Sequence, residues 1–523
     1  MSDTGKSDNP AAKEIELKLA VDPQDIDRLR RIDVIRAVRA RGRRQTDTYY
    51  DTADLRLTGN GLHLRVRQVG RRFVQTLKTA NHGGSPVQSR GEWSAVVPSL
   101  QPDLKAFGVD PTSLAPGPIE NADLRPLFSA SIARQTRLLT VANQTGGASR
   151  LELAIDRGAI SCAGNDIPVC EVELELIEGS AAALYSTALA ICREIPLRIA
   201  PLSKADRGYM LATAWRPSAD VGVRQDLTER MTIGDAMAGI FGDCLTSSTV
   251  NEAAVVHGTD PEGVHKMRVG LRRLRSAFTL FRKAMEPASC LALNDEARWV
   301  LGSLGDARDW DVFLNETLTE VEAARPEDTD LTLLREVAER KRQGGYATAR
   351  ETLLSPRYCA FVLNLGQWIE TRGWRGEAPS PIGQGPLSEF ARRTLTKRFK
   401  AVRKLGKNLE NLPPMDRHRL RIGVKKLRYA VEFFAGLFPH RETTLYLRRL
   451  SLLQEALGRM NDVSVMEARL SSLIAESSGD AALALGRASG KAIGWHAHAA
   501  AADEAKLAKH WKRVAKHDPF WIS

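Results

Sequence analysis

The chain has 523 residues, of which 43% are hydrophobic and 26% charged, a balance that excludes a mainly disordered, collagen-like or coiled-coil protein. This length exceeds that of a typical domain, so we expect at least two domains. Lys and Arg outnumber Asp and Glu by 75 to 63, an excess that gains meaning only where it is concentrated.

The amino-terminal segment shows no sign of export. It lacks the apolar core of a secretory signal, and we expect residues 1–12 to be disordered. No later stretch approaches the ~18–20 apolar residues of a transmembrane helix. The six cysteines include no CxxC pair, which favours a reducing compartment over disulfides or a zinc site. The sequence therefore predicts a cytoplasmic protein without a membrane partner.

Residues 13–213 alternate between apolar and polar side chains, the pattern of β-strands with two different faces. The clearest runs are Glu14–Ala20, Leu62–Gln68, Leu151–Asp156 and Glu171–Ile177. Shorter helical patterns at Gln24–Ile32 and Ala181–Glu194 lie between them. This part of the chain is therefore predicted to be an α+β unit dominated by an antiparallel sheet.

Several of these strands carry charges of one sign along one face. The acidic faces hold Glu14 and Glu16 on the first run, Glu152 and Asp156 on the third, and Glu171, Glu173 and Glu175 on the last. A basic face holds His63, Arg65 and Arg67. A solvated sheet face is the alternative interpretation, but stacked carboxylates repel one another unless a cation neutralises them. Oxygen ligands favour Mg²⁺ or Mn²⁺, and neighbouring basic residues suit a polyanionic phosphate.

The order of these motifs resembles the CYTH family, the triphosphate tunnel metalloenzymes. The matching segments are EIELKL (14–19), TDTYYDTADLRLTGNGLHLRVR (46–67), LKT (77–79), LELAIDRG (151–158), CEVELEL (170–176) and PLSKADRGY (201–209). The resemblance covers residues 13–213. It implies an antiparallel β-barrel tunnel whose charged faces point inward.

The resemblance also implies roles for individual residues. The implied metal ligands are Glu14, Glu16, Glu171, Glu173, Glu175 and Asp156, with Glu152 close by. The implied triphosphate ligands are Lys18, Arg65, Arg67, Lys78, Arg90, Arg134 and Lys204, and the implied catalytic residues are Glu171, Glu173 and Lys18. Arg137 is the alternative to Arg134, and structural ion pairs are the alternative for each basic residue. The implied reaction is Mg²⁺- or Mn²⁺-dependent hydrolysis of inorganic triphosphate to pyrophosphate and phosphate, with water activated by a metal or a carboxylate.

A linker is predicted at 214–227, and the periodicity then changes to 3.6 residues, which indicates helices. Within this half, Val264–Phe281 is similar to Arg417–Phe434 at a shift of 153 positions, which aligns His265 with His418. One register held over this length favours an internal duplication. Residues 228–515 are therefore predicted to be an all-α helical bundle built from two repeats.

The excess positive charge is concentrated in residues 391–450, which contain 17 Lys and Arg against 4 acidic residues. Two helical rows lie in this segment: His418, Arg421, Lys425 and Arg428; and Arg393, Lys397, Lys400 and Lys404. The first repeat contains the counterpart of the former row: His265, Arg268, Arg272 and Arg275. A solvated helix face is the alternative for any one row. Because acidic residues at helical spacing are scarce, we expect the rows to bind an external polyanion. Few aromatic residues accompany them, which disfavours nucleic acid and favours inorganic polyphosphate.

This half resembles the CHAD family, the conserved-histidine α-helical domain. The similar segments are VHKMRVGLRRLR (264–275), LGDARDWDV (304–312), HRLRIGVKKLR (418–428) and LGRMNDV (457–463). The resemblance covers about 228–515 and implies polyphosphate binding, with association to polyphosphate granules as a further expectation. Together the two domains resemble bacterial inorganic triphosphatases. Thiamine triphosphatase activity, class IV adenylate cyclase-like activity, a non-enzymatic granule-binding role and nucleic-acid binding remain alternatives.

Overall fold

The computed structural model describes residues 12–79, 87–107, 119–143, 146–222, 225–375, 381–502, 504–516 and 519–522. The chain forms two compact units. The first, here called the tunnel unit, comprises Met1–Val223 with Leu245–Gly270 and Glu351–Thr371. The second, the helical unit, comprises Arg224–Cys244, Leu271–Arg350 and Arg372–Ser523. Most of the segment predicted to be disordered, residues 1–11, lies outside the described residues, and the predicted linker remains a prediction.

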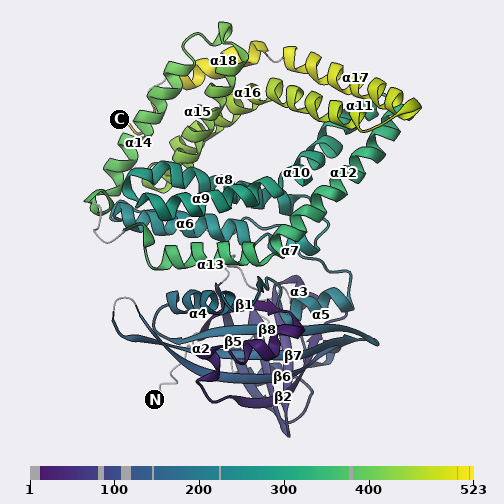
Figure 1. Ribbon diagram of the computed structural model, residues 1–523, viewed down its shortest axis with the longest axis vertical. Helices are drawn as coiled ribbons and strands as arrows, with labels where there is room; N and C mark the ends of the chain where they lie inside the picture. The colour runs from purple at the N-terminus through teal and green to yellow at the C-terminus, as the bar shows by residue number, and fades with distance from the viewer. Residues whose placement is uncertain are drawn as a thin grey trace, which may run out of the picture. The chain divides into compact units, whose positions relative to one another are not determined.

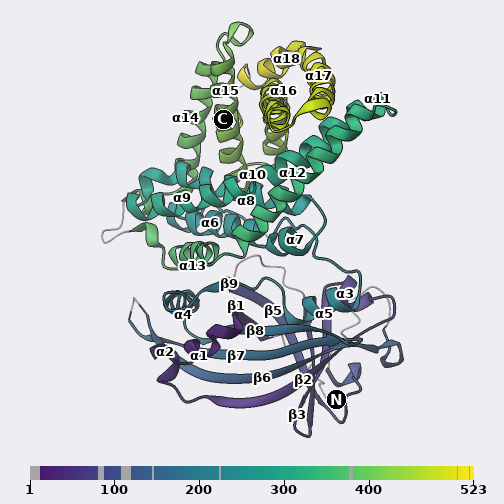
Figure 2. The same cartoon turned by 45° about the vertical axis from the view of Figure 1, so that its right-hand side comes forward.

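The tunnel unit is built on a nine-stranded antiparallel sheet with the order β5-β4-β3-β2-β6-β7-β8-β1-β9 (Figures 1 and 2). A further pairing between β5 and β1 closes the sheet into a barrel. The strands are β1 (Ala12–Val21), β2 (Arg41–Asp51), β3 (Leu62–Val69), β4 (Arg72–Thr79), β5 (Val87–Val97), β6 (Arg125–Ala142), β7 (Ala148–Cys162), β8 (Asn165–Glu178) and β9 (Leu197–Ile199). The prediction of an antiparallel β-barrel is confirmed.

Alternation along the strands divides apolar from charged side chains, as the sequence predicts. On β1, Leu17 and Leu19 are fully buried on the outer face, whereas Glu16 and Lys18 face the interior of the barrel. The short helices α1 (Ile26–Leu29) and α2 (Asp33–Arg36) and the longer α4 (Ala182–Cys192) belong to the same unit, and α4 contacts β6, β7 and β8. Burial of these apolar positions fixes the register and thereby the inward direction of the charges.

Helix α5 (Lys204–Ala212) is held against the inner wall of the barrel. Its Tyr209 packs edge-on against Phe128, which in turn stacks on Tyr49 with a centroid distance of 4.6 Å. Gly208 permits this approach, because a Cβ there would lie 1.9 Å from the Phe128 ring. The helix therefore forms a fixed floor for the cavity described below.

From residue 225 onward the described chain is mostly helical. Its helices are α6 (Ile233–Thr249), α7 (Glu252–His257), α8 (Glu262–Phe281), α9 (Pro287–Ser303), α10 (Gly305–Val312), α11 (Thr319–Ala324), α12 (Thr329–Leu353), α13 (Pro356–Glu370), α14 (Leu387–Leu405), α15 (Pro414–Phe433), α16 (His440–Ala475), α17 (Gly479–Ala502) and α18 (Glu504–Ala515). No helix among the described residues is both long and apolar enough to cross a membrane. The all-α prediction is confirmed for this half.

The two sequence repeats meet in the core of the helical unit. Phe281 at the end of α8 and its counterpart Phe434, just after α15, contact each other with a centroid distance of 6.4 Å, and Phe390 packs on both. Another cluster joins Trp310 and Leu334 to residues of α16 and α17.

Candidate active site

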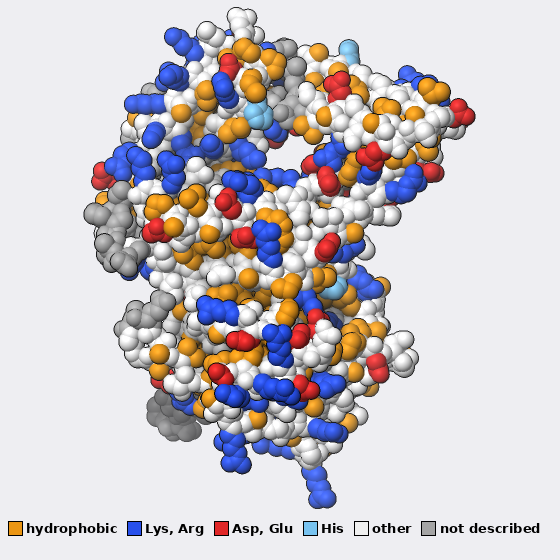
Figure 3. Space-filling model, in the orientation of Figure 1, with side chains coloured by type: hydrophobic (Ala, Val, Ile, Leu, Met, Phe, Trp, Pro, Cys, Tyr) orange, Lys and Arg blue, Asp and Glu red, His pale blue; other side chains and the backbone are white. Residues whose placement is uncertain are grey.

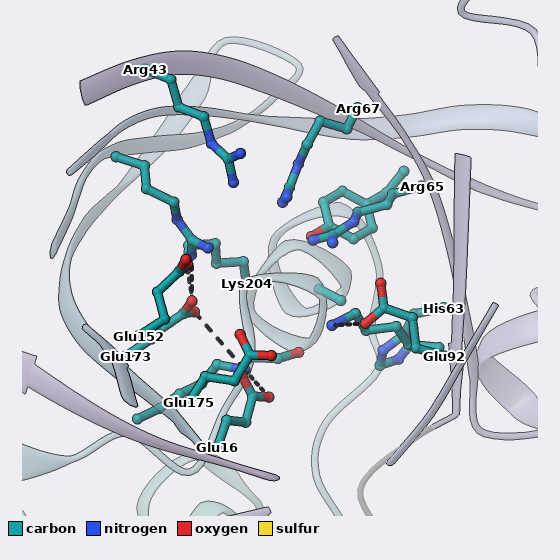
Figure 4. A pocket seen from close by; sticks show the side chains of 16 residues that line it. Glu16, Arg43, His63, Arg65, Arg67, Glu92, Glu152, Glu173, Glu175 and Lys204 are labelled. Atoms are coloured by element: carbon teal, nitrogen blue, oxygen red, sulfur yellow. Dashed lines mark hydrogen bonds and ion pairs between the residues drawn. The ribbon is translucent and has the colours of Figure 1, made fainter. Parts of the chain in front are cut away.

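A charged cavity of about 270 Å³ lies inside the barrel (Figure 4). Its lining includes seven cationic residues, namely Lys18, Arg43, Arg65, Arg67, Lys78, Arg134 and Lys204. It also includes five carboxylates, namely Glu16, Glu92, Glu152, Glu173 and Glu175. Figure 4 shows Glu16, Glu152, Glu173 and Glu175 on one side of the cavity and Arg43, Arg65 and Arg67 across from them. The inward-facing acidic and basic faces expected from the sequence therefore share one enclosed space.

Strand register arranges the acidic residues at two depths. Asp156 on β7 lies opposite Glu171 on β8, and Glu173 is the next inward residue of β8; we call these three residues the inner trio. Glu175 lies between Glu16 of β1 and Glu152 of β7; we call these the outer row. Asp156 and Glu171 are buried, whereas Glu152 and Glu175 are half-buried. Glu16 of the outer row is buried as well, so the two groups differ in their position along the strands rather than simply in burial.

The inner trio is neutralised by side chains of the protein itself. Lys204 Nζ lies 2.7 Å from Asp156 and 2.9 Å from Glu173, and it also donates to Glu171. Arg134 binds Asp156 with both ends of its guanidinium and contacts Glu173 as well. Burial opposes ionisation of Glu173, but Arg134, Lys204 and Lys18 hold its pKa well below the ordinary value. Basic side chains of the protein therefore lie against all three carboxylates of the trio.

The basic wall is organised by Asp47 on β2. Its fully buried carboxylate accepts hydrogen bonds from Arg67 at 2.7 and 2.8 Å and from Arg65 at 3.3 Å. Burial alone would raise the pKa of Asp47, but Arg65 and Arg67 lower it to about 2. Asp47 was not among the residues predicted for the site. The sequence held one clue to this residue, because Asp47 lies in the run TDTYYD of a segment that resembles the family. In the structure Asp47 lies directly opposite Arg67.

Other pairs complete the lining. Lys18 lies 2.6 Å from Glu16, and Lys78 lies 2.8 Å from Glu92. Arg43 on β2 also faces the cavity and was missed because its segment carried no motif. These pairs orient several cations toward the space that a polyanion would occupy.

Most predicted tunnel residues lie where the sequence placed them. Glu16, Glu173, Glu175, Lys18, Arg65, Arg67, Lys78, Arg134 and Lys204 line the cavity, and Asp156 and Glu171 contact Lys204 directly behind it. Arg134, rather than its alternative Arg137, is the inward residue of β6, since Arg137 has the opposite parity. Glu14 and Arg90 are opposite each other on β1 and β5, but their side chains lie outside the described ones.

Both acidic groups offer oxygen ligands for a metal ion, but the cations around these ligands differ. The outer row offers carboxylate oxygens, which suit a hard divalent cation. The inner trio has ligand atoms within 4.8 Å of one another, but the ammonium group of Lys204 lies among them. Each group also contacts a lysine, since Lys18 lies 2.6 Å from Glu16, but only in the inner trio does one ammonium group, that of Lys204, contact all three carboxylates.

The three basic rows on α8, α15 and α14 differ in how many of their side chains have acidic partners. Arg421 lies 3.6 Å from Asp462, Arg428 lies 3.6 Å from Glu432, and Arg275 bonds Asn294. The expectation that the rows on α8 and α15 lack acidic compensation is therefore wrong for Arg421 and Arg428, because partners lie on another helix or one turn later. His265, Arg268, Arg272 and Lys425 are half-buried, and His418 is exposed.

The row on α14 agrees with the expectation that the basic side chains lack acidic partners. Arg393, Lys397, Lys400 and Lys404 are exposed, and none has an acidic partner among the described residues. Figure 3 shows Lys and Arg side chains gathered over the part of the helical unit that contains α14. This row is therefore the basic surface best suited to an external polyanion.

Comparison with known proteins identifies two families along the chain. Residues 12–209 match the family model of the CYTH domain, and residues 239–471 match that of the CHAD domain. An inorganic triphosphatase of Haemophilus influenzae is 29% identical over 209 residues, which are 39% of this chain and 57% of that protein. The chain thus spans little more than half the length of that curated relative.

Solved structures provide a second comparison. The CHAD domain from the plant Ricinus communis is 33% identical, with a TM-score of 0.50, and the match covers 58% of this chain and 97% of that one. PptA from Streptomyces chartreusis is 18% identical with a TM-score of 0.42, covering 54% and 100% of the two chains. The family matches, the barrel and the helices together show that this chain belongs to the proteins in which a CYTH domain is followed by a CHAD domain.

Proposed function

We propose that the tunnel unit hydrolyses inorganic triphosphate to pyrophosphate and phosphate with Mg²⁺ or Mn²⁺. The observation that carries the proposal is the single cavity with seven cations facing five carboxylates. Hydrolysis of a P–O–P bond requires stabilisation of negative charge on the transferred group and the leaving oxygens. The similarity of residues 12–209 to the CYTH domain supports the same reaction class.

Different residues of the cavity would bind the phosphate oxygens and accept the proton of the attacking water. Arg65 and Arg67, held by Asp47, bind phosphate oxygens through charge-assisted hydrogen bonds, and Lys78 contributes a third cation. A divalent metal bound at the outer row would neutralise phosphate oxygens and polarise the attacking water. Glu171 and Glu173 both pair with Lys204, and the proton of the attacking water would pass to a β8 carboxylate that the metal does not engage, as the sequence predicts.

Lys18 is positioned to connect the two groups of acids. Its ammonium lies 2.6 Å from Glu16 in the outer row and 3.9 Å from Glu173 in the inner trio. A cation there attracts a phosphate oxygen without leaving the carboxylates uncompensated. We therefore keep Lys18 as a substrate ligand that also assists catalysis.

The cavity lining favours inorganic triphosphate over organic triphosphates. Tyr49 and His63 supply the only rings among the lining residues, and twelve of the sixteen are Lys, Arg or Glu. A nucleobase or thiazole would require an apolar or stacking surface. Thiamine triphosphatase and adenylate cyclase-like activities are therefore the less favoured candidates.

A substrate panel tests this proposal. Phosphate release by the full chain from inorganic triphosphate, thiamine triphosphate and ATP would be measured with and without Mg²⁺ or Mn²⁺. We expect the highest kcat/KM for inorganic triphosphate and loss of turnover without metal. Arg67→Met should raise KM, whereas Arg36→Met, at an exposed surface pair, should not. Faster turnover of an organic substrate, or cyclic nucleotide formation, would overturn the assignment.

For the helical unit we propose binding of inorganic polyphosphate through the α14 row. Four exposed cations on one helix provide charge without aromatic stacking surfaces, which suits a polymer that has no bases. Association with polyphosphate granules would follow from such binding. The cytoplasmic location predicted from the sequence fits the same proposal.

Cosedimentation of the full chain with long-chain polyphosphate tests the second proposal. Lys397→Glu combined with Lys400→Glu should weaken binding strongly, and rising salt should weaken binding by the wild type. Arg298→Glu is the control, because Arg298 is exposed but already paired with Asp295. Equal effects of the control and the α14 variant, or stronger retention of DNA than of polyphosphate, would contradict the proposal.

A further inference from the structure

Lys204 begins α5 and points into the barrel interior rather than toward solvent. Its side chain is 7% exposed. Ser203 caps the helix, accepting a hydrogen bond from Asp206 N, while the Asp206 carboxylate accepts from Ser203 N and Oγ. This reciprocal cap fixes the first turn of α5. The position of the Lys204 ammonium is therefore set by the helix as well as by its ion pairs.

The inner trio is saturated by three cations. The two Asp156 oxygens accept from Arg134, and one also contacts Lys204. The Glu173 oxygens are divided between Arg134 and Lys204. The Glu171 oxygens are divided between Lys204 and Arg207, the latter at 2.6 Å. All six carboxylate oxygens thus accept from a side-chain cation, and three negative charges face three positive ones.

This geometry suits an ammonium ion and not a small divalent metal. Two of the Lys204 contacts measure 2.7 and 2.9 Å, the range of charge-assisted N–H···O bonds. Mg²⁺ requires oxygens at about 2.1 Å and sheds its hydration shell reluctantly. A divalent ion entering with Lys204 in place would add two positive charges to a network already balanced. In the outer row, Lys18 pairs with Glu16 at 2.6 Å, whereas Glu152 makes no ion pair or hydrogen bond among the described residues.

We propose that Lys204 is the resident cation of the inner trio, which it keeps closed to divalent metal, so that metal binds at the outer row. Lys204 then acts as a positioning residue: it pairs with Glu171 and Glu173, holds their carboxylates in place and fixes α5 as the floor of the cavity. The inference deepens the proposed metal dependence and rests on it only for the outer row. The closure of the trio by Lys204 can be tested without any substrate.

The test counts Mn²⁺ ions bound by the full chain without phosphate, from the electron paramagnetic resonance signal of free Mn²⁺ during a titration. Lys204→Met, which keeps the length of the side chain but removes its charge, should add one Mn²⁺ per chain. Asp156→Asn in that background should remove the added ion, whereas Lys204→Arg should retain the wild-type count. In the wild-type background, Glu152→Gln should reduce Mn²⁺ binding and Glu171→Gln should not.

A structural readout accompanies the count, because Lys204→Met leaves a buried negative charge. In metal-free buffer, the thermal unfolding midpoint of Lys204→Met should be lower than that of the wild type. Added Mn²⁺ should raise the midpoint of the variant by more than it raises the midpoint of the wild type. If the variant is recovered only in Mn²⁺, one additional ion should remain after desalting. An unchanged count in Lys204→Met, or loss of a site in Glu171→Gln, would overturn the inference. A wild type that binds no Mn²⁺ would instead refute the proposed metal dependence, while the gain in Lys204→Met would still support closure by Lys204.

Discussion

Replacing Asp47 by Asn tests how the basic wall of the cavity is held together. Asp47 is fully buried and binds both Arg65 and Arg67. Its pKa falls from 3.8 to about 2, and a shift of that size corresponds to roughly 2 kcal/mol of stabilisation. Removing one partner of a buried ionic group costs about 3–5 kcal/mol, because the remaining charges lose their partner. We therefore expect Asp47→Asn to destabilise the tunnel unit by about 2–4 kcal/mol.

Differential scanning calorimetry of the full chain measures this effect. For a unit of this size, 1 kcal/mol corresponds to a shift of about 2–4 °C, so the midpoint of the affected transition should fall by roughly 5–10 °C. The matched control is Asp33→Asn, since Asp33 lies 2.7 Å from Arg36, the same distance that separates Asp47 from Arg67. That pair is exposed, so its loss should cost less than about 1 kcal/mol.

The pH dependence of the same comparison has a defined sign. A depressed carboxyl pKa stabilises the folded chain above pH 3.8, and the stabilisation is lost as pH falls toward about 2. The difference between the wild type and Asp47→Asn should thus be complete at pH 6 and shrink below pH 4. Equal shifts for Asp47→Asn and Asp33→Asn at pH 6 would refute the argument that burial strengthens the Asp47 pairs.

Three further substitutions address other parts of the tunnel unit. Glu152→Gln should raise the Mn²⁺ concentration needed for half-maximal triphosphate hydrolysis, and an unchanged metal titration would exclude it as a ligand. Gly208→Ala should lower the melting temperature by several degrees, because its Cβ would overlap the Phe128 ring, whereas Gly59→Ala, with open space around it, should have a small effect. Burial raises the pKa of Glu252 to about 8, so the stability of the wild type should decline between pH 4.5 and 8. Glu252→Gln should lose that decline, and parallel pH profiles would contradict it.

Strand alternation predicted which side chains share a face, because side-chain direction depends only on local parity, and the resemblance to the CYTH family implied that the charged faces point into a tunnel. Glu16, Glu173 and Arg67 do face inward. The partners of these residues depend on register between distant strands, which no local pattern specifies. Asp47 was missed for that reason, because only the pairing of β2 with β3 places it opposite Arg67.

The inner trio illustrates a second limit. Stacked acids on β8 led to the expectation of a neutralising metal, and neutralisation is indeed present. The cation beside Glu171 and Glu173, however, is Lys204, more than thirty positions along the chain, with Arg134 and Arg207. Like-charge repulsion predicts that a counterion exists but not which one, because an internal ammonium and a metal ion satisfy the same electrostatic demand.

The helical unit shows what repetition can and cannot predict. The shift of 153 positions identified Phe281 and Phe434 as counterparts, and these rings contact each other in the core. The same rows were expected to lack acidic partners, yet Glu432 lies one turn after Arg428 and was visible in the sequence. Asp462 reaches Arg421 from another helix and was not. Charge counts along one helix therefore overestimate the free positive charge of a packed bundle.

Crystals grown with Mn²⁺ and pyrophosphate, examined by anomalous diffraction at the manganese edge, test the central claim most directly. The account predicts manganese beside Glu175 of the outer row, phosphate density against Arg65 and Arg67, and Lys204 still among the inner carboxylates. Phosphate density outside the barrel, with no manganese in the cavity, would contradict it.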